Sequence, residues 1–327
     1  MPEQLSLTDL DALHLAAHSA EIASSEGGES LLLDGLALLP ESTLQQGTIE
    51  VDIATEGPAY PGIVFRAADT LNYELAYAQP HTSDEWDALQ YDPIFHGANC
   101  WQIYHGEAYQ RPTQVPTGRW FTLRVTFAGC RARICVDEQA PLVIERLAHP
   151  HQEGMVGVWS YRPAYFRNLR ISPSAQILEE GREIAQPLDA SWQRVHAWFV
   201  EGLGMAVCEA NGALNLHRYL PSSVRGITLS RRLLVASETE AELAFGYSDV
   251  LELSLDGETL HQGENTFTRS PEWEARGYVV PEHRLTVRLT PGEHRLTAML
   301  QVTEPFGWGL AMALRGDGIE LLPPEWS

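Results

Sequence analysis

Residues 47–54 read Gly-Thr-Ile-Glu-Val-Asp-Ile-Ala, and this stretch decides the fold class. Apolar and polar residues alternate at every second position, which is the side-chain period of a β-strand with one buried face. The same alternation, bounded by Gly, Pro and Asp, recurs along the chain, whereas helical periodicity is confined to short pieces. The sequence therefore predicts an all-β protein.

Short strands are predicted on both sides of residues 47–54, without long helical patterns between them. In the second half, Asp256-Gly257 stands between two alternating segments, as in a type I′ β-hairpin. Many strands at short intervals are typical of antiparallel β-sandwiches and jelly rolls. The other expected strands are residues 62–67, 72–78, 101–106, 120–127, 131–136, 142–145, 154–160, 165–171, 226–235, 241–245, 250–255, 285–289, 296–302 and 310–314.

A polar, acidic stretch at residues 172–187, SPSAQILEEGREIAQP, interrupts the strand pattern. Such composition is typical of a linker between separately folded domains. We therefore expect two β-sandwich domains in tandem, residues 1–171 and residues 188–327, with the first able to fold alone.

The formal net charge of −22 over 327 residues disfavours nucleic acid and anionic membranes as partners, because both reward a concentrated basic patch. Neutral ligands such as saccharides remain compatible with this charge. No apolar run reaches the length of a membrane span, and the first residues lack the basic and apolar regions of a signal peptide. A cytoplasmic location without a membrane partner is expected.

Cysteine spacing and short motifs exclude several chemistries. The four cysteines show neither CxxC spacing nor Cys/His pairing, which predicts reduced thiols. His149 and His151 form the closest histidine pair, but Pro150 lies between them and no third ligand is evident. Phosphate loop, nucleophile elbow and HExxH motifs are absent from the sequence. We predict no metal site and no cofactor, and leave open a calcium ion in a loop.

The first half contains, in order, the motifs Gly47-Thr-Ile-Glu-Val-Asp, Gly62-Ile-Val-Phe-Arg, Asn72-Tyr-Glu-Leu, Gly118-Arg-Trp-Phe and Gly154-Met-Val-Gly-Val. Through these motifs it resembles the concanavalin A-like lectin/glucanase superfamily, in particular its laminin-G-like members. Each motif alone is weak because ordinary strand and turn chemistry produces much of it.

The second half is similar to galactose-binding-like jelly rolls, through Phe245-Gly-Tyr-Ser-Asp, Leu255-Asp-Gly-Glu-Thr-Leu, Gly263-Glu-Asn and Phe306-Gly-Trp-Gly. Both resemblances imply an association with saccharides, although each superfamily also contains protein-binding and structural members.

A charged groove is the first candidate site. Alternation puts Glu50 and Asp52 on the face of their strand opposite Ile49, Val51 and Ile53. By the same rule Arg66 and Glu74 share that polar face on neighbouring strands, where Arg66 is expected to hold the carboxylates together as a ligand-binding residue. The alternative is a solvated outer face with cross-strand ion pairs.

Hydrolysis by these carboxylates is a weaker hypothesis. Glucanases of the superfamily carry a Glu-x-Asp-x-Glu run, and here Ala54 stands in the place of the second glutamate. Glu56 lies about 20 Å from Glu50 along an extended strand, whereas glycosidase carboxyl pairs are roughly 5–9.5 Å apart. The catalytic candidates are therefore Glu50, Asp52 and Glu74, with Asp52 and Glu74 as a dyad from different strands.

Aromatic, amide and acidic residues are concentrated in residues 85–105. Saccharide sites use this mixture, because rings stack on the sugar while amides and carboxylates bind its hydroxyls. The alternative is that these rings are core residues. The expected ligand-binding residues are Arg66, Trp86, Gln90, Tyr91, Trp101, Gln102 and Tyr104, with Tyr247, Asp249, Asn265, Trp273 and Trp308 as candidates in the second domain.

These observations predict a protein that binds or acts on carbohydrate. Two alternatives stay open. One is a glycoside hydrolase that uses carboxylates on the concave sheet, and the other is a non-catalytic module that presents its loops to a protein partner.

Overall fold

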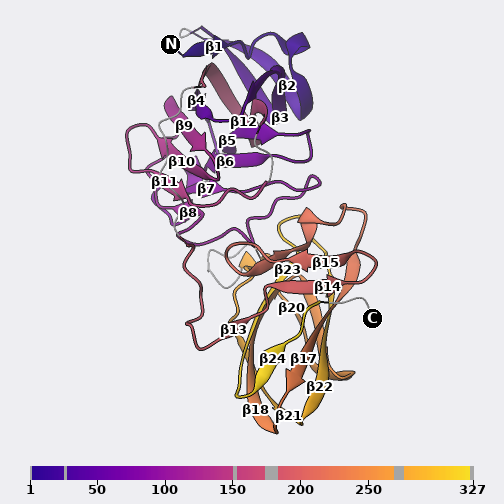
Figure 1. Ribbon diagram of the computed structural model, residues 1–327. Coiled ribbons are helices and arrows are strands. Elements are labelled where there is room, and N and C mark those ends of the chain that lie inside the picture. The colour runs from indigo at the N-terminus through magenta and orange to yellow at the C-terminus, as the bar shows by residue number, and fades with distance from the viewer. Residues whose placement is uncertain (1, 26–27, 150–152, 174–182, 269–275, 325–327) are drawn as a thin grey trace. The chain divides into compact units, whose positions relative to one another are not determined.

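The computed structural model describes residues 2–25, 28–149, 153–173, 183–268 and 276–324. The protein is all-β, as predicted, and is built from antiparallel sheets that form β-sandwiches (Figure 1). In the described residues no helix is long and apolar enough to cross a membrane. The helical elements that the structure describes are single 3₁₀ turns at Leu10–Ala12, Pro80–Thr82 and Leu216–Arg218.

The chain divides into two compact units, and each takes residues from two parts of the sequence. The first unit is Met1–Gly97 with Tyr104–Glu183, and the second is Ala98–Ile103 with Ile184–Ser327. The hexapeptide Ala98–Ile103 therefore differs from the expected division, which placed it in the first domain. Most of the stretch expected as a linker lies outside the described residues.

The first unit contains twelve described strands. They are β1 (Glu3–Leu5), β2 (His14–Ser25), β3 (Gly28–Leu44), β4 (Gly47–Ala54), β5 (Tyr60–Ala67), β6 (Glu74–Ala78), β7 (Leu89–Tyr91), β8 (Gln110–Arg111), β9 (Phe121–Ala128), β10 (Arg131–Val136), β11 (Leu142–Ile144) and β12 (Gly154–Ser172).

Strand β12 joins the two layers of this unit. Its first half pairs with β5, and its second half pairs with β4. The strand order is β11-β10-β9-β4-β12-β5-β6-β7-β8, with β1 and β3 also on β12 and β2 on β3. One layer is thus built on β4 and β9 and the other on β5 and β6, with β12 bending from one to the other.

The two layers bury their residues differently. Strands β4 and β9 alternate strictly between buried and half-buried residues, so their outward face is polar. Strands β5 and β6 are buried almost throughout, which means that both of their faces are covered. Phe65 on β5 contacts Phe127 on β9 with ring centroids 4.9 Å apart, and this contact marks the interior between the layers.

Two β-bulges set the side-chain directions that matter for function. On β5 the pairing with β12 shifts between Met155 and Gly157, and Arg66 adopts a positive φ of 51° there. On β12 the pairing with β4 shifts between Arg167 and Arg170, and Asn168 has φ 52°. An extra residue in a strand reverses the faces of the residues after it.

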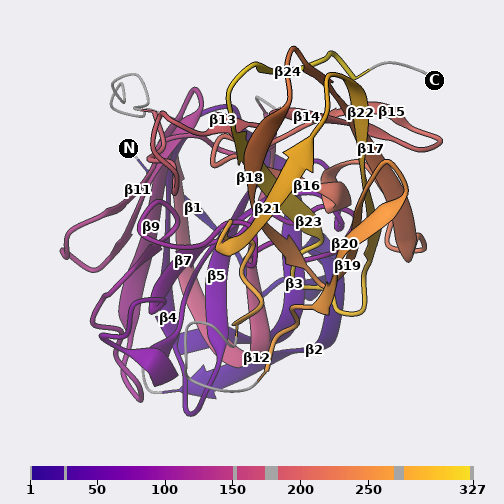
Figure 2. The same cartoon turned by 90° about the horizontal axis from the view of Figure 1, so that it is seen from below.

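The second unit is a sandwich of two sheets (Figure 2). One sheet has the order β13-β23-β18-β21 with β16 on β23, and the other has β15-β14-β17-β22-β19-β20 with β24 on β17. The strands are β13 (Gln193–Arg194), β14 (Ala197–Val200), β15 (Gly204–Val207), β16 (Ala213–Asn215), β17 (Gly226–Val235), β18 (Thr239–Ser248), β19 (Val250–Leu255), β20 (Glu258–Glu264), β21 (His283–Leu289), β22 (Gly292–Gln301), β23 (Gly309–Arg315) and β24 (Ile319–Leu321).

Leucines and aromatic residues from both sheets form the core of the second unit, including the fully buried Trp198, Phe245 and Trp308. The predicted hairpin at Asp256-Gly257 is confirmed. Leu255 pairs with Glu258 across it, and both turn residues have positive φ, 52° and 86°, as a type I′ turn requires.

Several expected strands need correction. Residues 101–106 form turns and no strand. The segments expected at 154–160 and 165–171 are one continuous strand, β12. Strands β2 and β3 were not predicted from the sequence, because His14–Ser25 lacks clean alternation and residues 31–33 are three consecutive leucines.

Candidate functional site

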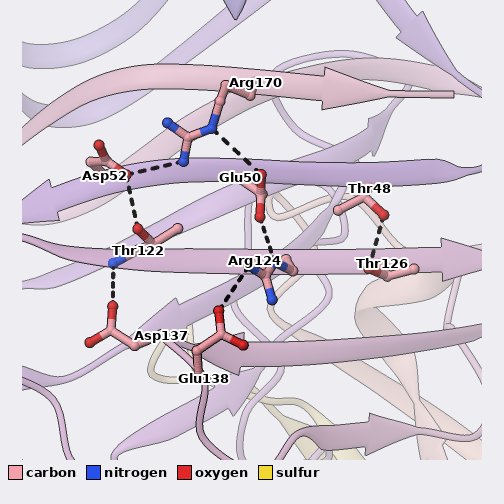
Figure 3. Close-up of polar contacts among 9 residues, drawn as sticks. All are labelled: Thr48, Glu50, Asp52, Thr122, Arg124, Thr126, Asp137, Glu138 and Arg170. Carbon is pink, nitrogen blue, oxygen red and sulfur yellow. Dashed lines mark hydrogen bonds and ion pairs between the residues drawn. The ribbon is translucent and has the colours of Figure 1, made fainter. Parts of the chain in front are cut away.

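A polar face covers β4, β9 and the end of β12, and we define it by Glu50, Asp52, Arg124 and Arg170 (Figure 3). Glu50 Oε1 lies 2.5 Å from Arg124 Nε, and Glu50 Oε2 lies 3.5 Å from Arg170 Nε. The hydrogen bond to Glu50 raises the pKa of the Arg124 guanidinium above its ordinary value. Glu50 thus bridges two guanidinium groups from the two neighbouring strands.

Asp52 is held in the same way. Its Oδ1 accepts from Thr122 Oγ1 at 2.9 Å and from Arg170 Nη2 at 3.2 Å, and its Oδ2 accepts from Asn168 Nδ2 at 2.7 Å. All four oxygens of Glu50 and Asp52 therefore have donors within the protein. The arrangement matches the alternative of cross-strand ion pairs more closely than a pair of carboxylates available for catalysis.

Arg66 does not lie on this face, which corrects the expectation from alternation. The bulge on β5 turns its side chain toward the interior, where Nη2 donates to Gln45 O at 3.2 Å and Gly129 O at 2.7 Å. The guanidinium also lies 5.2 Å from the Phe127 ring centroid. Burial lowers the pKa of Arg66, and the charge of Glu74 acts in the opposite direction.

Glu74 also points inward. It pairs with Phe65 across the β5–β6 ladder and is fully buried. Its Oε2 accepts from Tyr91 Oη at 2.5 Å and its Oε1 from His149 N at 3.0 Å. Asp52 faces outward with Thr122, so the hypothetical dyad of Asp52 and Glu74 does not form.

Three more expected ligand-binding residues lie in the interior of the first unit. Tyr91, Tyr104 and Gln90 are all buried. The Tyr91 ring stacks on Tyr109, and burial raises the pKa of Tyr91 well above its ordinary value. Gln90 Oε1 accepts from Gln110 Nε2 at 3.2 Å. These rings and amides pack the interior, as the alternative interpretation of this segment stated, while Trp86 is half-buried.

Trp101 and Gln102 belong to the second unit, where Asp249 and Asn265 also lie. Asp249 is fully buried, and its Oδ2 accepts from Thr303 N at 2.5 Å and from Glu304 N at 2.9 Å. Asn265 Nδ2 donates to two main-chain carbonyls. Tyr247 and Trp308 are core residues, while His151 and Trp273 lie outside the described residues. No cluster of three metal-ligating side chains occurs among the residues described.

Aromatic rings from β5, β6 and β12 form a separate cluster. The centroid distances are 5.6 Å for Tyr60–Tyr161, 6.2 Å for Tyr60–Tyr77 and 5.9 Å for Tyr77–Trp159. Interplanar angles of 51–64° show that the rings pack against one another instead of forming a flat platform. Tyr161 is the exposed member, at 56%.

A groove of about 420 Å³ opens beside the polar face, between the start of the chain and β12. Leu5, which is half-buried, and Leu7, which is buried, supply its apolar floor, whereas Gln4, Glu29 and Asn168 are exposed at its rim. Its lining residues are Gln4, Leu5, Ser6, Leu7, Thr8, Glu29, Phe166, Arg167 and Asn168.

The side chains of this groove contrast with those of the polar face. Among the described residues, Gln4 and Glu29 have no side-chain hydrogen bond or ion pair, and Asn168 uses only its Nδ2, toward Asp52. The Arg167 guanidinium stacks on the Trp120 ring at 3.9 Å, which fixes one wall. The groove thus combines an apolar floor with amide and carboxylate groups that can bind a ligand.

No local pattern in the sequence points to this groove. Simple alternation would put Arg167 and Arg170 on opposite faces, and only the bulge at Asn168 brings both to the side of Asp52. Gln4 reaches the groove because β1 pairs with β12, where Gln4 lies opposite Arg170. Strand pairing between residues more than 160 positions apart is not visible in a local pattern.

Comparisons with known proteins give structural neighbours but no family. No protein-family model matches the chain, and no curated protein matches it. A carbohydrate binding module, CBM66, from Bacillus subtilis is similar over 48% of this chain and 94% of its own, with 18% identity and a TM-score of 0.38. A Bacillus subtilis protein of unknown function with a galectin-like fold is similar over 54% of this chain and 100% of its own, with 11% identity and a TM-score of 0.40.

A third neighbour is domain 4 of an extracellular arabinanase from Geobacillus stearothermophilus, solved with arabinotriose. It covers 47% of this chain and 78% of its own, with 10% identity and a TM-score of 0.24.

Proposed function

We propose that the first unit is a non-catalytic saccharide-binding module and that its ligand lies in the groove between residues 4–8 and β12. The observation that carries this proposal is the lining of the groove. An apolar floor is surrounded by amides, hydroxyls, a carboxylate and a guanidinium that come from separate segments. Ligand sites combine an apolar floor with a few placed polar groups in this way.

The volume of the groove sets the size of the ligand. About 420 Å³ lies at the lower end of the range for small-molecule sites, roughly 300–1,000 Å³. A groove of this size suits one or two sugar rings and leaves the rest of a longer glycan in solvent. The proposed ligand is therefore a monosaccharide or the end of an oligosaccharide.

The polar groups also indicate a neutral ligand. The Gln4 amide both donates and accepts, the Glu29 carboxylate accepts, and the Arg167 guanidinium donates. Sugar hydroxyls need both kinds of partner. Because the chain carries a net charge of −22, an uncharged sugar avoids the long-range repulsion that an anionic one meets.

Hydrolysis is not part of the proposal. Glu50 and Asp52 have their oxygens occupied by guanidinium, hydroxyl and amide donors, and Glu74 lies inside the sandwich. A glycosidase needs two carboxyl groups on either side of one bond. The candidate carboxylates do not meet that condition.

The test is isothermal calorimetry with glucose, galactose, xylose, arabinose and fructose, and with their short oligosaccharides. We expect at least one of these to bind the wild-type chain, and the double substitution Gln4→Ala/Glu29→Gln to weaken that binding at least tenfold. Tyr161→Ala is the matched control, since it removes an exposed ring of the same unit outside the groove.

Two outcomes would contradict the proposal. The first is an absence of binding to every saccharide at millimolar concentration by a folded protein. The second is a loss of affinity in Tyr161→Ala with none in Gln4→Ala/Glu29→Gln, which would move the site to the aromatic cluster.

A further inference from the structure

The hexapeptide Ala98–Ile103 is surrounded by loops of the second unit, to which it belongs. It forms a turn in which Ile103 N donates to Cys100 O at 2.9 Å. Contacts reach it from Ser248 at the end of β18, from residues 276–279 and from residues 302–308 before β23. These loops form one end of the second sandwich, which we call the loop end.

The Gln102 side chain is bound at the loop end through its whole amide. Its Nε2 donates to Glu304 Oε1 at 2.7 Å and to Arg276 O at 3.1 Å, and its Oε1 lies 2.8 Å from Ser248 Oγ. The Gln102 main chain adds two bonds, from its N to Phe306 O at 3.0 Å and from Val279 N to its O at 2.9 Å.

Two glycines leave the space that this amide occupies. A Cβ on Gly277 would lie 2.5 Å from Gln102 Nε2, and a Cβ on Gly307 would lie 2.7 Å from Gln102 Cβ. Gly277 also has φ 71°, which residues with side chains rarely adopt. The loops are thus shaped around a primary amide at this position.

Trp101 occupies an aromatic cage beside this position. Its ring centroid is 5.3 Å from Phe306, 5.5 Å from Phe267 and 5.8 Å from Tyr278, and the last two contacts are edge-to-face. Such contacts contribute beyond simple apolar burial. Indole and amide therefore each have a separate, fitted subsite.

The loop end has a framework of its own. Asp249 Oδ2 accepts from Thr303 N, Thr303 Oγ1 and Glu304 N, which fixes the loop that carries Glu304. Phe267 N donates to Glu304 Oε1 at 2.6 Å, and Asn265 N donates to Asp249 O at 2.6 Å. None of these bonds involves the hexapeptide, so the loop that carries Glu304 is held by the second unit's own residues.

We propose that the loop end of the second unit is a recognition site for a short peptide that presents an indole followed by a primary amide, and that Ala98–Ile103 fills this site as an internal ligand. The proposal is independent of saccharide binding in the first unit. A free peptide with the same two side chains takes the site once the internal segment is prevented from binding.

The experiment uses the full chain with Trp101→Ala/Gln102→Glu. The first substitution empties the cage, and the second places a carboxylate against Glu304 at pH 8. A fluorescent peptide with the sequence of residues 97–104 is titrated by anisotropy into this variant and into the wild-type chain. The control peptide carries the same two substitutions as the variant.

We expect the native-sequence peptide to bind the variant saturably. Its affinity for the variant should be at least tenfold higher than its affinity for the wild-type chain, and at least tenfold higher than the affinity of the control peptide for the variant. Equal binding of both peptides, or no binding by a variant that unfolds cooperatively, overturns the proposal. If the second unit loses cooperative unfolding in this variant and also in Gln102→Ala, the hexapeptide is an integral part of the fold, which overturns it as well.

Discussion

The polar face and the groove lie side by side on the first unit, yet their polar side chains differ in whether they have hydrogen-bond partners within the protein. On the polar face, Glu50 and Asp52 have every carboxylate oxygen within reach of a donor. In the groove, among the residues that the structure describes, Gln4 and Glu29 have no side-chain partner. Charge density alone would have selected the polar face as the binding site. The hydrogen bonds favour the groove instead, because Gln4 and Glu29 lack side-chain partners within the described part of the protein and are available to bind a ligand.

The comparison is tested first by breaking the polar face. Glu50→Ala leaves Arg124 and Arg170 without the carboxylate between them, and both guanidinium groups are about 30% exposed. We expect a loss of about 2 kcal/mol in the free energy of unfolding, between the values for exposed and buried pairs. Urea unfolding measures it, and saccharide affinity should change less than twofold.

Thr126→Val is the control on the same face, where its hydroxyl lies 3.0 Å from that of Thr48. It should cost about 1 kcal/mol or less. An equal loss in both variants would show that Glu50 holds the strands no better than a neutral pair does.

The second prediction concerns Asn168, the residue shared by both regions. Asn168→Gly keeps the positive φ of 52° but removes the amide from the rim of the groove. Saccharide affinity should fall about tenfold, or about 1.4 kcal/mol, while the free energy of unfolding falls by about 1 kcal/mol because Asp52 Oδ2 loses its donor. Calorimetry and urea unfolding on the same preparation measure the two effects.

Arg162→Gly serves as the control for this variant, because Arg162 also has a positive φ, 73°, and is exposed away from the groove. Unchanged affinity in Asn168→Gly would remove the rim amide from the site and weaken the distinction between the two regions.

The smallest expected change in stability comes from the ion pair of His294 and Asp256 in the second unit, and it depends on pH. His294 Nδ1 lies 2.6 Å from Asp256 Oδ2, and its Nε2 lies 2.7 Å from Thr290 O. The bond to the Thr290 carbonyl, followed by the bond to Asp256, raises the pKa of His294. Burial acts to raise the pKa of Asp256, but the bonds from Arg295 N and His294 outweigh it and lower that pKa.

The sign of the pH effect follows from these directions. A histidine with a raised pKa adds stability that is complete below its unfolded pKa of about 6.5 and disappears as pH rises through the folded value. The wild-type chain should therefore exceed His294→Gln in stability at pH 5.5, by about 1 kcal/mol or less, and lose this advantage by pH 9. Unfolding free energies of the two proteins across that range measure it, and a constant difference would contradict the assignment.

Strand positions followed from the sequence wherever one face of a strand is polar. Strand β4 has the predicted bounds, 47–54, because its outward face carries Thr48, Glu50 and Asp52. The hairpin at Asp256-Gly257 followed from turn chemistry, since these residues tolerate the positive φ of a type I′ turn. Strand β3 shows no period of two because residues 36–39, Leu-Ala-Leu-Leu, are all buried in succession.

The site could not be predicted, for reasons that concern single residues. Arg66 and Asn168 lie at bulges, and each bulge reverses the side-chain direction that alternation implies. Alternation with Tyr73 and Leu75 predicts an outward Glu74, but its partner across the ladder is Phe65, which faces the interior. The register between paired strands decides which way such a side chain points, and a single sequence does not reveal that register.

Residues 98–103 belong to the second unit, although they lie between two segments of the first. The loop end of the second unit is filled by a hexapeptide that is encoded inside the coding region of the first. A recombination event near codon 184 would transfer a β-sandwich whose loop end lacks Trp101 and Gln102. Neither unit can be exchanged as one uninterrupted block of gene, so the pair is expected to evolve together as a single cassette.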